Sequence, residues 1–137
     1  MKISSVKVDV VKVEEGVWVE NIPELEGVKL RVRGAGNRDW KRMMQRLVAS
    51  VPRQKRRNGN IDPDEMERIL GTVMLETGLL DWSGIEGDDD KPIPYSKEKA
   101  KEYLLDPQWQ VIRDGVSWAC NFVGRDVEEA VEDISGN

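Results

Sequence analysis

Apolar and charged residues alternate along two segments in the first third of the chain. In residues 6–10 valine occupies every second position, and residues 28–33 repeat the pattern with Val28, Leu30 and Val32. This spacing gives a strand one apolar face and one charged face. A shorter apolar run at 17–19 lies between turn-forming segments. We therefore expect three short strands in a small antiparallel sheet, which needs other elements to cover its apolar face.

After Gly34-Ala35-Gly36 the apolar spacing becomes that of amphipathic helices. Asn37 is the expected N-cap of the first helix, which should end before Pro52. The firmest helix start is Asp62-Pro63, because Glu65 follows in the N3 position of a capping box. These helices are expected to cover the sheet.

Two further helices are expected in the second half of the chain. Ser96 should cap a short helix, and Asp106-Pro107 should start a longer one, in which Gly115 allows close packing against a neighbour. We thus predict an α+β fold, with a small N-terminal antiparallel β-sheet followed by a mainly helical bundle. The chain is expected to form a single domain, with a β-rich part at 1–36, a helical part at 37–125 and an acidic tail at 126–137.

Charge is unevenly distributed along the chain. Between Lys29 and Arg57 there are eleven basic residues and a single acid, Asp39, which gives a local net charge of +10 and leaves −15 for the remainder. The residues of the predicted basic patch are Arg42, Arg46, Arg53, Lys55, Arg56 and Arg57. A solvated face or a protein contact is favoured over nucleic-acid binding, because the whole chain is acidic and no aromatic residue lies in the basic loop.

Few residues are suited to catalysis. The chain has no histidine, and its one cysteine, Cys120, lies in an apolar helical pattern that favours a buried thiol. Asp88-Asp89-Asp90 lacks the ligand spacing of a calcium loop, and Gly34-Ala35-Gly36 lacks the lysine of a phosphate-binding loop. We therefore expect no enzyme activity, no cofactor and no metal site. No apolar stretch has the length of a membrane span, so no membrane contact is expected.

The stretch 81–107 has the composition of a surface loop anchored at both ends. It holds Trp82 and Ile85 between turn-forming residues, followed by Pro94 and Tyr95. Such a segment is typical of recognition. For Trp82, anchoring within the chain is favoured over contact with a partner, because the other three residues offer it a local apolar site.

Four of the five methionines lie on expected helices, at Met43, Met44, Met66 and Met74. Flexible methionine side chains suit an adaptable groove for a nonpolar partner. Their helical spacing favours packing in the core instead.

The order of these segments resembles that of the tail assembly chaperones of long-tailed bacteriophages. The most specific part of the resemblance is the succession of Trp-Ser-Gly-Ile, Pro-Tyr-Ser and Asp-Pro, and the likeness extends over about residues 17–133. The residues that match the shared pattern are Trp82, Gly84, Ile85, Pro94, Tyr95, Asp106 and Pro107. They serve either to set the fold or to contact a partner.

The resemblance implies a non-enzymatic protein that binds the tape measure protein and keeps it soluble during tail assembly. It also implies the host cytoplasm as the location, absence from the mature virion, and the tail tube protein as a further partner. The separated charges add an expectation of homo-oligomers. The alternatives are a virion structural protein, such as a head-tail connector or tail terminator subunit, and, with less support, a nucleic-acid-binding regulator. The sequence identifies neither the phage nor the partner-binding surface.

Overall fold

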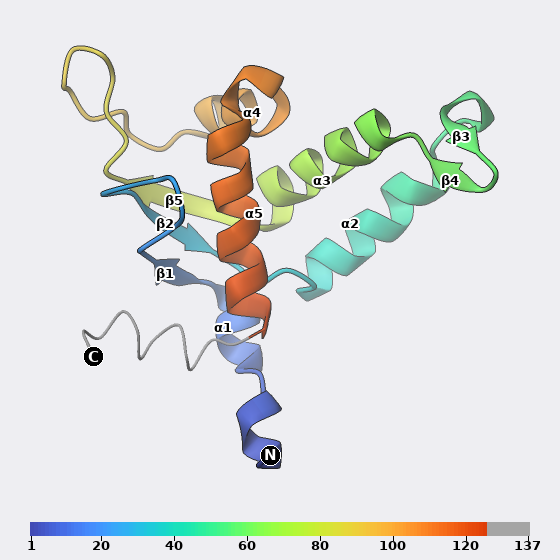
Figure 1. The fold of residues 1–137 in the computed structure, drawn as a ribbon, viewed down its shortest axis with the longest axis horizontal. Coiled ribbons are helices and arrows are strands. Elements are labelled where there is room, and N and C mark those ends of the chain that lie inside the picture. Colours follow the sequence, from blue (N-terminus) through green and yellow to red (C-terminus); the bar gives the residue numbers. More distant parts are fainter. Residues whose placement is uncertain (126–137) are drawn as a thin grey trace.

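Three strands from distant parts of the chain pair in one antiparallel sheet (Figure 1). The computed structural model describes residues 1–125. In spatial order the strands are β1 (Val17–Val19), β2 (Lys29–Val32) and β5 (Leu79–Ser83). The central residue Leu30 pairs with Val19 on one side and with Trp82 on the other, and all three are buried in the main core. The α+β class predicted from the sequence is confirmed.

The prediction of a strand at residues 6–10 is wrong. A 3₁₀ turn (Ile3–Val6) and a short helix, α1 (Val10–Glu15), occupy this segment instead. The carboxylate of Asp9 accepts a hydrogen bond from the backbone N–H of Lys12 at 3.2 Å, which caps the helix. Helical geometry also turns Val13 into the core. The cap at Asp9 and the burial of Val13 thus favour a helix, although the alternating pattern favours a strand.

The third strand comes from a segment that the sequence predicted to be the end of a helix and the start of a loop. Gly78 ends the preceding helix, and the chain continues at once as β5. The sheet therefore takes a strand from the part at 37–125 that was expected to be helical. The predicted acidic tail at 126–137 lies outside the described residues.

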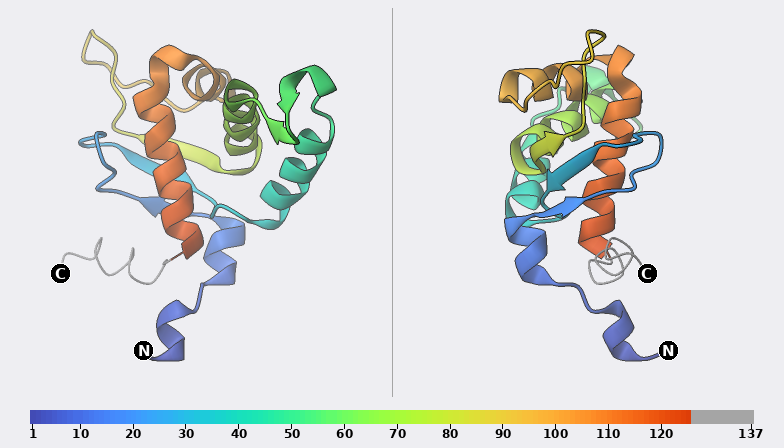
Figure 2. Two further views of the ribbon diagram at one scale, coloured as in Figure 1. Left: turned by 45° about the vertical axis from the view of Figure 1, so that its right-hand side comes forward. Right: turned by 90° about the vertical axis from the view of Figure 1, so that its left-hand side faces the viewer.

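The long helix α5 (Gln110–Arg125) lies across one face of the sheet (Figure 2). Its buried residues include Val116, Ala119 and Val123, which pack in the main core with the inward side chains of the strands. As expected, Gly115 permits close packing, because a Cβ atom there would collide with the side chain of Leu25. The apolar face of the sheet is therefore covered, as a three-stranded sheet requires.

Two helices and a small hairpin extend away from the sheet (Figure 1). They are α2 (Arg38–Ala49), a 3₁₀ turn (Arg53–Lys55), β3 (Arg56–Arg57), β4 (Asn60–Ile61) and α3 (Pro63–Thr77). We call residues 38–61 the wing. The wing packs on α3 around a second, smaller core. The residues of this core are Val51, Ile69 and Val73, with Trp40, Met43, Met44, Leu47 and Ile61 packed against them.

The remaining helix, α4 (Lys97–Leu105), packs against both α3 and α5. Ser96 caps it through a hydrogen bond from the backbone N–H of Lys99, and Asp106 accepts one from Gln108 to start the 3₁₀ turn Pro107–Trp109 that leads into α5. Both predicted caps are confirmed. Within residues 1–125, no helix combines the length and the apolar composition needed to cross a bilayer.

Candidate interaction surface

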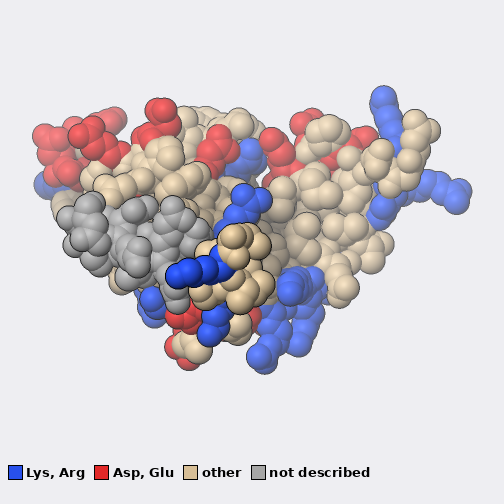
Figure 3. Space-filling model, turned by 60° about the horizontal axis from the view of Figure 1, so that its bottom comes forward, with Lys and Arg blue, Asp and Glu red and all other residues tan. Residues whose placement is uncertain are grey.

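The outer side of the wing carries a group of exposed basic residues. Their charged side chains form no ion pair within residues 1–125. We call this group the basic face, and its members are Arg38, Lys41, Arg42, Arg46, Arg53 and Arg57. Figure 3 shows basic side chains gathered over this end of the molecule, whereas acidic side chains gather over the loops at the other end. Within the described residues, the basic part of the sequence is thus gathered at one end of the molecule.

Helical geometry explains the arrangement on α2. Arg38, Arg42 and Arg46 follow one another at intervals of four residues and lie along one side of the helix. Met43 and Leu47 lie on the opposite side and pack against α3. Consequently α2 presents its charges outward while its apolar side is attached to the rest of the protein.

One buried side chain fixes the start of α2. The side-chain oxygen of Asn37 accepts a hydrogen bond from the backbone N–H of Trp40 at 2.9 Å, which confirms the predicted cap. Its side-chain nitrogen donates to the carbonyl oxygens of Gly34 at 3.0 Å and of Thr77 at 2.8 Å. The sequence indicated the cap but not this link to the end of α3. Asn37 is fully buried and has its polar atoms satisfied, so the wing begins at a fixed point.

A group of ion pairs also holds the start of α2 in place, and the sequence did not reveal it. The guanidinium of Arg33, just after β2, contacts the carboxylates of Asp39 at 2.8 Å and of Glu14 at 3.4 Å. Glu14 also accepts a hydrogen bond from the backbone N–H of Arg38 at 3.0 Å. These contacts join α1, β2 and α2 at the base of the wing.

Arg56 holds the other end of α2. Its guanidinium donates to the carbonyl oxygens of Val48, in the last turn of α2, and of Val51, at 3.3 Å for the second, and so joins the start of the hairpin to the end of the helix. Lys55 contacts Glu65 on α3 at 3.0 Å. Arg56 and Lys55 therefore have structural contacts, whereas Arg42, Arg46, Arg53 and Arg57 of the predicted basic patch are exposed. The predicted patch thus contains two residues that stabilise the fold and four exposed residues that are available for contact.

Glu65 does not complete the capping box that the sequence predicted. The side chain of Asp62 makes no cap hydrogen bond, and the buried carboxylate of Glu65 contacts Arg68 and Lys55 instead. Hydrogen bonds from these two cations, first Arg68 and then Lys55, lower the pKa of Glu65 from its ordinary value of 4.5 to about 2. The hairpin is therefore joined to α3 through a carboxylate that remains ionised in mild acid.

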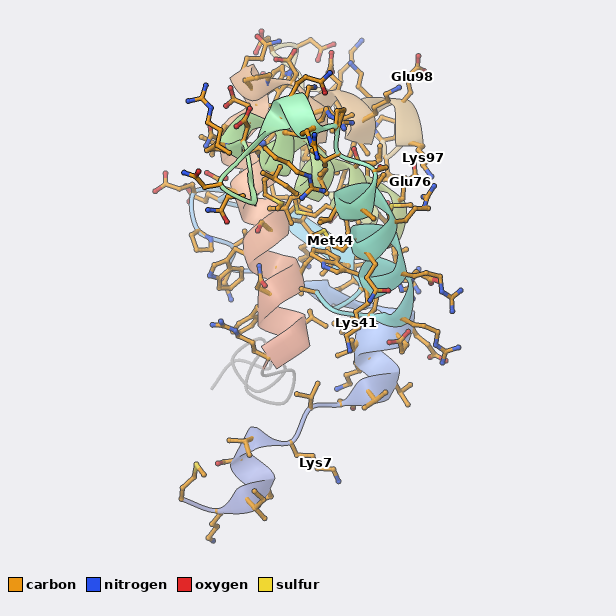
Figure 4. All side chains as sticks on the ribbon, turned by 90° about the vertical axis from the view of Figure 1, so that its right-hand side faces the viewer. Lys7, Lys41, Met44, Glu76, Lys97 and Glu98 are labelled. Atoms are coloured by element: carbon orange, nitrogen blue, oxygen red, sulfur yellow. The ribbon has the colours of Figure 1, made fainter. Side chains whose placement is uncertain are left out.

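Methionines border the basic face. Met43 and Met44 pack against the smaller core, which confirms the preferred interpretation of their spacing, yet both are only half-buried. Lys41 and Met44 lie about one turn apart on α2 (Figure 4). Charged and polarisable apolar groups are thus available side by side on this helix.

The stretch 81–107 contains a clamp between strand and loop. The indole N–H of Trp82 donates to the carbonyl oxygen of Ile93 at 2.8 Å, and the ring of Tyr95 meets the indole edge-to-face at 5.0 Å. The backbone N–H of Ile93 also donates to Ile85 at 2.8 Å. The predicted intramolecular anchoring of Trp82 is therefore correct. The indole is buried and makes a poor contact surface for a partner.

The other motif residues also shape the chain. Gly84 has a φ of +84°, and a Cβ atom there would overlap the carbonyl oxygen of Gly27, so this position needs glycine. Pro94 is exposed. Asp106 and Pro107 start a turn some distance along the chain. The ring of Tyr103 links this turn to the clamp, because it lies 5.1 Å from the ring of Trp109 and 5.6 Å from that of Trp82. The structure thus brings Trp82, Gly84, Ile85 and Tyr95 together and leaves the Asp-Pro pair apart.

Two further candidate chemical groups have structural explanations. Cys120 is fully buried, and burial raises the pKa of its thiol to about 12, which makes the nucleophilic thiolate scarce. In the acidic loop Asp89 accepts a hydrogen bond from the backbone N–H of Lys91 at 3.1 Å and so closes a turn. Among residues 1–125 no group of three or more acidic, cysteine or histidine side chains is placed to hold a metal ion.

Comparison with known proteins gives one match. The model of a protein family described as YdaY prophage protein matches residues 35–137. This range includes the wing, its supporting helix α3 and the clamp, whereas β1 and β2 precede it. No curated protein and no solved structure matches the chain.

Proposed function

The chain belongs to the YdaY prophage protein family, and from this premise we propose that it is a non-enzymatic tail assembly chaperone. Its partner would be the tape measure protein, which it keeps soluble in the host cytoplasm until the tail tube has formed, with the tail tube protein as a further partner. The phage origin rests on the family match, and the tail function rests on the sequence resemblance together with the surface described above.

The basic face is the observation that carries the proposal. Its six cations are exposed on one side of a wing that Asn37 and Arg56 hold at both ends. A surface of this kind suits an acidic partner, because unpaired charges attract the opposite charge over distance and select the orientation of binding. Because the surface is mounted on a supported helix, little ordering cost arises on binding.

The shape and composition of α2 favour a helical partner. Its 12 residues form a rod of about 18 Å, at 1.5 Å per residue. A partner helix lying along the exposed side of α2 would meet Arg42 and Arg46 with its acidic side chains. One such contact is weak. Several copies along one long partner would bind tightly by multivalency.

Nucleic acid is the second candidate partner, since the same six cations would also neutralise phosphates. A virion structural protein is the remaining alternative. A tail tube subunit is expected to contain more and longer strands than the five strands of two to five residues found within residues 1–125. This comparison favours the chaperone over a tube subunit.

Co-expression with the tape measure protein of the same prophage tests the proposal. The wild-type chain should raise the soluble fraction of the tape measure protein, and the variant R38E/R42E/R46E should not. The matched control is K91E/K99E/K101E, which makes the same change in net charge at exposed lysines away from the wing. Equal tape measure solubility with and without the wild-type chain would refute the proposal. Binding of a DNA or RNA duplex that only the wing variant loses would favour the regulator.

A further inference from the structure

Exposed large apolar side chains are concentrated near one end of the described chain. Five of the seven lie in residues 1–11, and a sixth is Trp18 on β1. The five are Met1, Ile3, Val6, Val10 and Val11. A monomeric protein seldom exposes a contiguous apolar group of this kind, which marks a contact surface.

The segment before α1, residues 1–9, forms an arm that projects from the body (Figure 1). Only Val8 of the arm packs against the main core, and Val6 is 56% exposed. The alternation of valine with charged residues in 6–10 favours a strand, yet no strand forms there. The sequence of the arm therefore favours a β-strand, but within residues 1–125 of its own chain the arm pairs with no strand.

In the described part of the chain, the edge strand β1 has an unpaired edge to which a further strand can bind. Among the described residues it pairs with β2 alone, so its other edge presents free backbone hydrogen-bonding groups. Trp18 points away from the covered face and is 42% exposed. Its ring borders an open hollow of about 400 Å³, which Val19, Glu20, Lys29 and Ser83 also line.

The arm cannot pair with β1 of its own chain while α1 is present. The eight residues between Val8 and Val17 are fewer than a parallel crossover needs. An antiparallel hairpin would require α1 to unfold and would remove Val13 from the core. An arm that completes this edge must therefore come from another molecule.

Complementary charges indicate that the arm on β1 belongs to a second copy of this chain. The arm carries Lys2 and Lys7, while Glu15 and Glu20 flank β1 on either side. Figure 4 shows Lys7 on the projecting arm, away from the body. We propose that the arm of one copy lies along β1 and Trp18 of a second copy, and that the two copies exchange arms about a two-fold axis. Each arm then extends the partner's sheet by one strand, and its valines cover the exposed indole.

Sedimentation over a concentration series tests this dimer. The wild-type chain should dimerise, and Val6→Asp and Trp18→Ser should each weaken the dimer by about tenfold or more, since central aromatic and apolar contacts dominate interface energies. Val111→Asp is the matched control, because Val111 is also 56% exposed but lies on α5. It should leave the dimer unchanged. Circular dichroism verifies that each variant is folded.

Disulfide trapping gives the second test. Ser5→Cys chains mixed with Glu20→Cys chains keep Val6 and Trp18, and the new cysteines of the two variants can be joined only between copies. Cys120 is fully buried and is not expected to react. We expect rapid formation of the mixed disulfide, and none when Val111→Cys replaces Ser5→Cys. A wild-type chain that stays monomeric at all concentrations, or a dimer indifferent to both the arm and Trp18 variants, would overturn the inference. Neither experiment includes a phage partner, so their outcomes are independent of the chaperone proposal.

Discussion

The side-chain nitrogen of Asn37 donates a hydrogen bond to the carbonyl oxygen of Thr77 at 2.8 Å, although the two residues are forty positions apart. This bond ties the residue just before the wing to Thr77, the last residue of α3. Because Asn37 also caps α2, one buried amide determines both where the helix begins and where it is attached. The direction in which the basic face points depends on it.

Replacement of Asn37 by alanine should therefore lower the free energy of unfolding by about 2–4 kcal/mol. Loss of the cap accounts for about 1 kcal/mol. The unsatisfied carbonyls of Gly34 and Thr77 account for about 1–3 kcal/mol. Urea denaturation measures the change. Asn121→Ala is the control, because Asn121 is exposed and bonds only within its own helix, so a change within about 0.5 kcal/mol is expected there. Equal losses in the two variants would contradict the role given to Asn37.

Trp82→Phe should release the loop at residues 84–94. The variant keeps an apolar ring but lacks the N–H that donates to Ile93, which costs about 1 kcal/mol of unfolding free energy for the bond alone. We expect faster hydrogen exchange at the backbone amide of Ile93, which bonds to Ile85. Trp18→Phe is the comparison, since Trp18 is an exposed indole on the same sheet. If exchange at Ile93 is unchanged in the Trp82 variant, the clamp does not hold the loop.

Acid should weaken the attachment of the hairpin through Glu65. The folded-state pKa is about 2, below the ordinary value of 4.5, so this carboxylate stabilises the fold fully above about pH 4.5. Its contribution is lost as the pH falls from there towards 2. Glu65→Gln should therefore make the unfolding free energy less dependent on pH in that range.

Glu98→Gln is the control for this titration, because Glu98 is exposed on α4 and makes no ion pair within residues 1–125. Denaturation at a series of pH values compares the two variants with the wild type. Identical slopes for both variants would show that Glu65 has no special role.

Local features of the fold could be predicted from the sequence. The caps at Asn37, Ser96 and Asp106 each bond to a backbone group two or three positions away, so residue type and spacing were sufficient. The apolar stripe of α2 also follows from spacing alone. In the clamp, turn formers and aromatic residues close together in the chain indicated the anchoring of Trp82.

Long-range features could not be predicted in this way. β5 is a strand because Leu30 pairs with Trp82, and no local signal in 79–83 specifies that partner. The sequence placed Glu65 in a capping box, but its carboxylate pairs with two cations, Arg68 in the same helix and Lys55 in the turn before β3. Within the predicted basic patch, only the structure separates Arg56, which holds the end of α2, from Arg42 and Arg46, which are exposed.

The most direct test of the chaperone account is the affinity of the purified chain for a helical segment of the tape measure protein, measured by calorimetry over a salt series. We expect binding that weakens with salt, since ionic screening acts on exposed charges. We also expect R38E/R42E/R46E to bind about tenfold or more weakly, whereas K91E/K99E/K101E binds as the wild type does. Equal affinity in the wild type and the wing variant, unaffected by salt, would contradict the claim that the basic face is the binding surface.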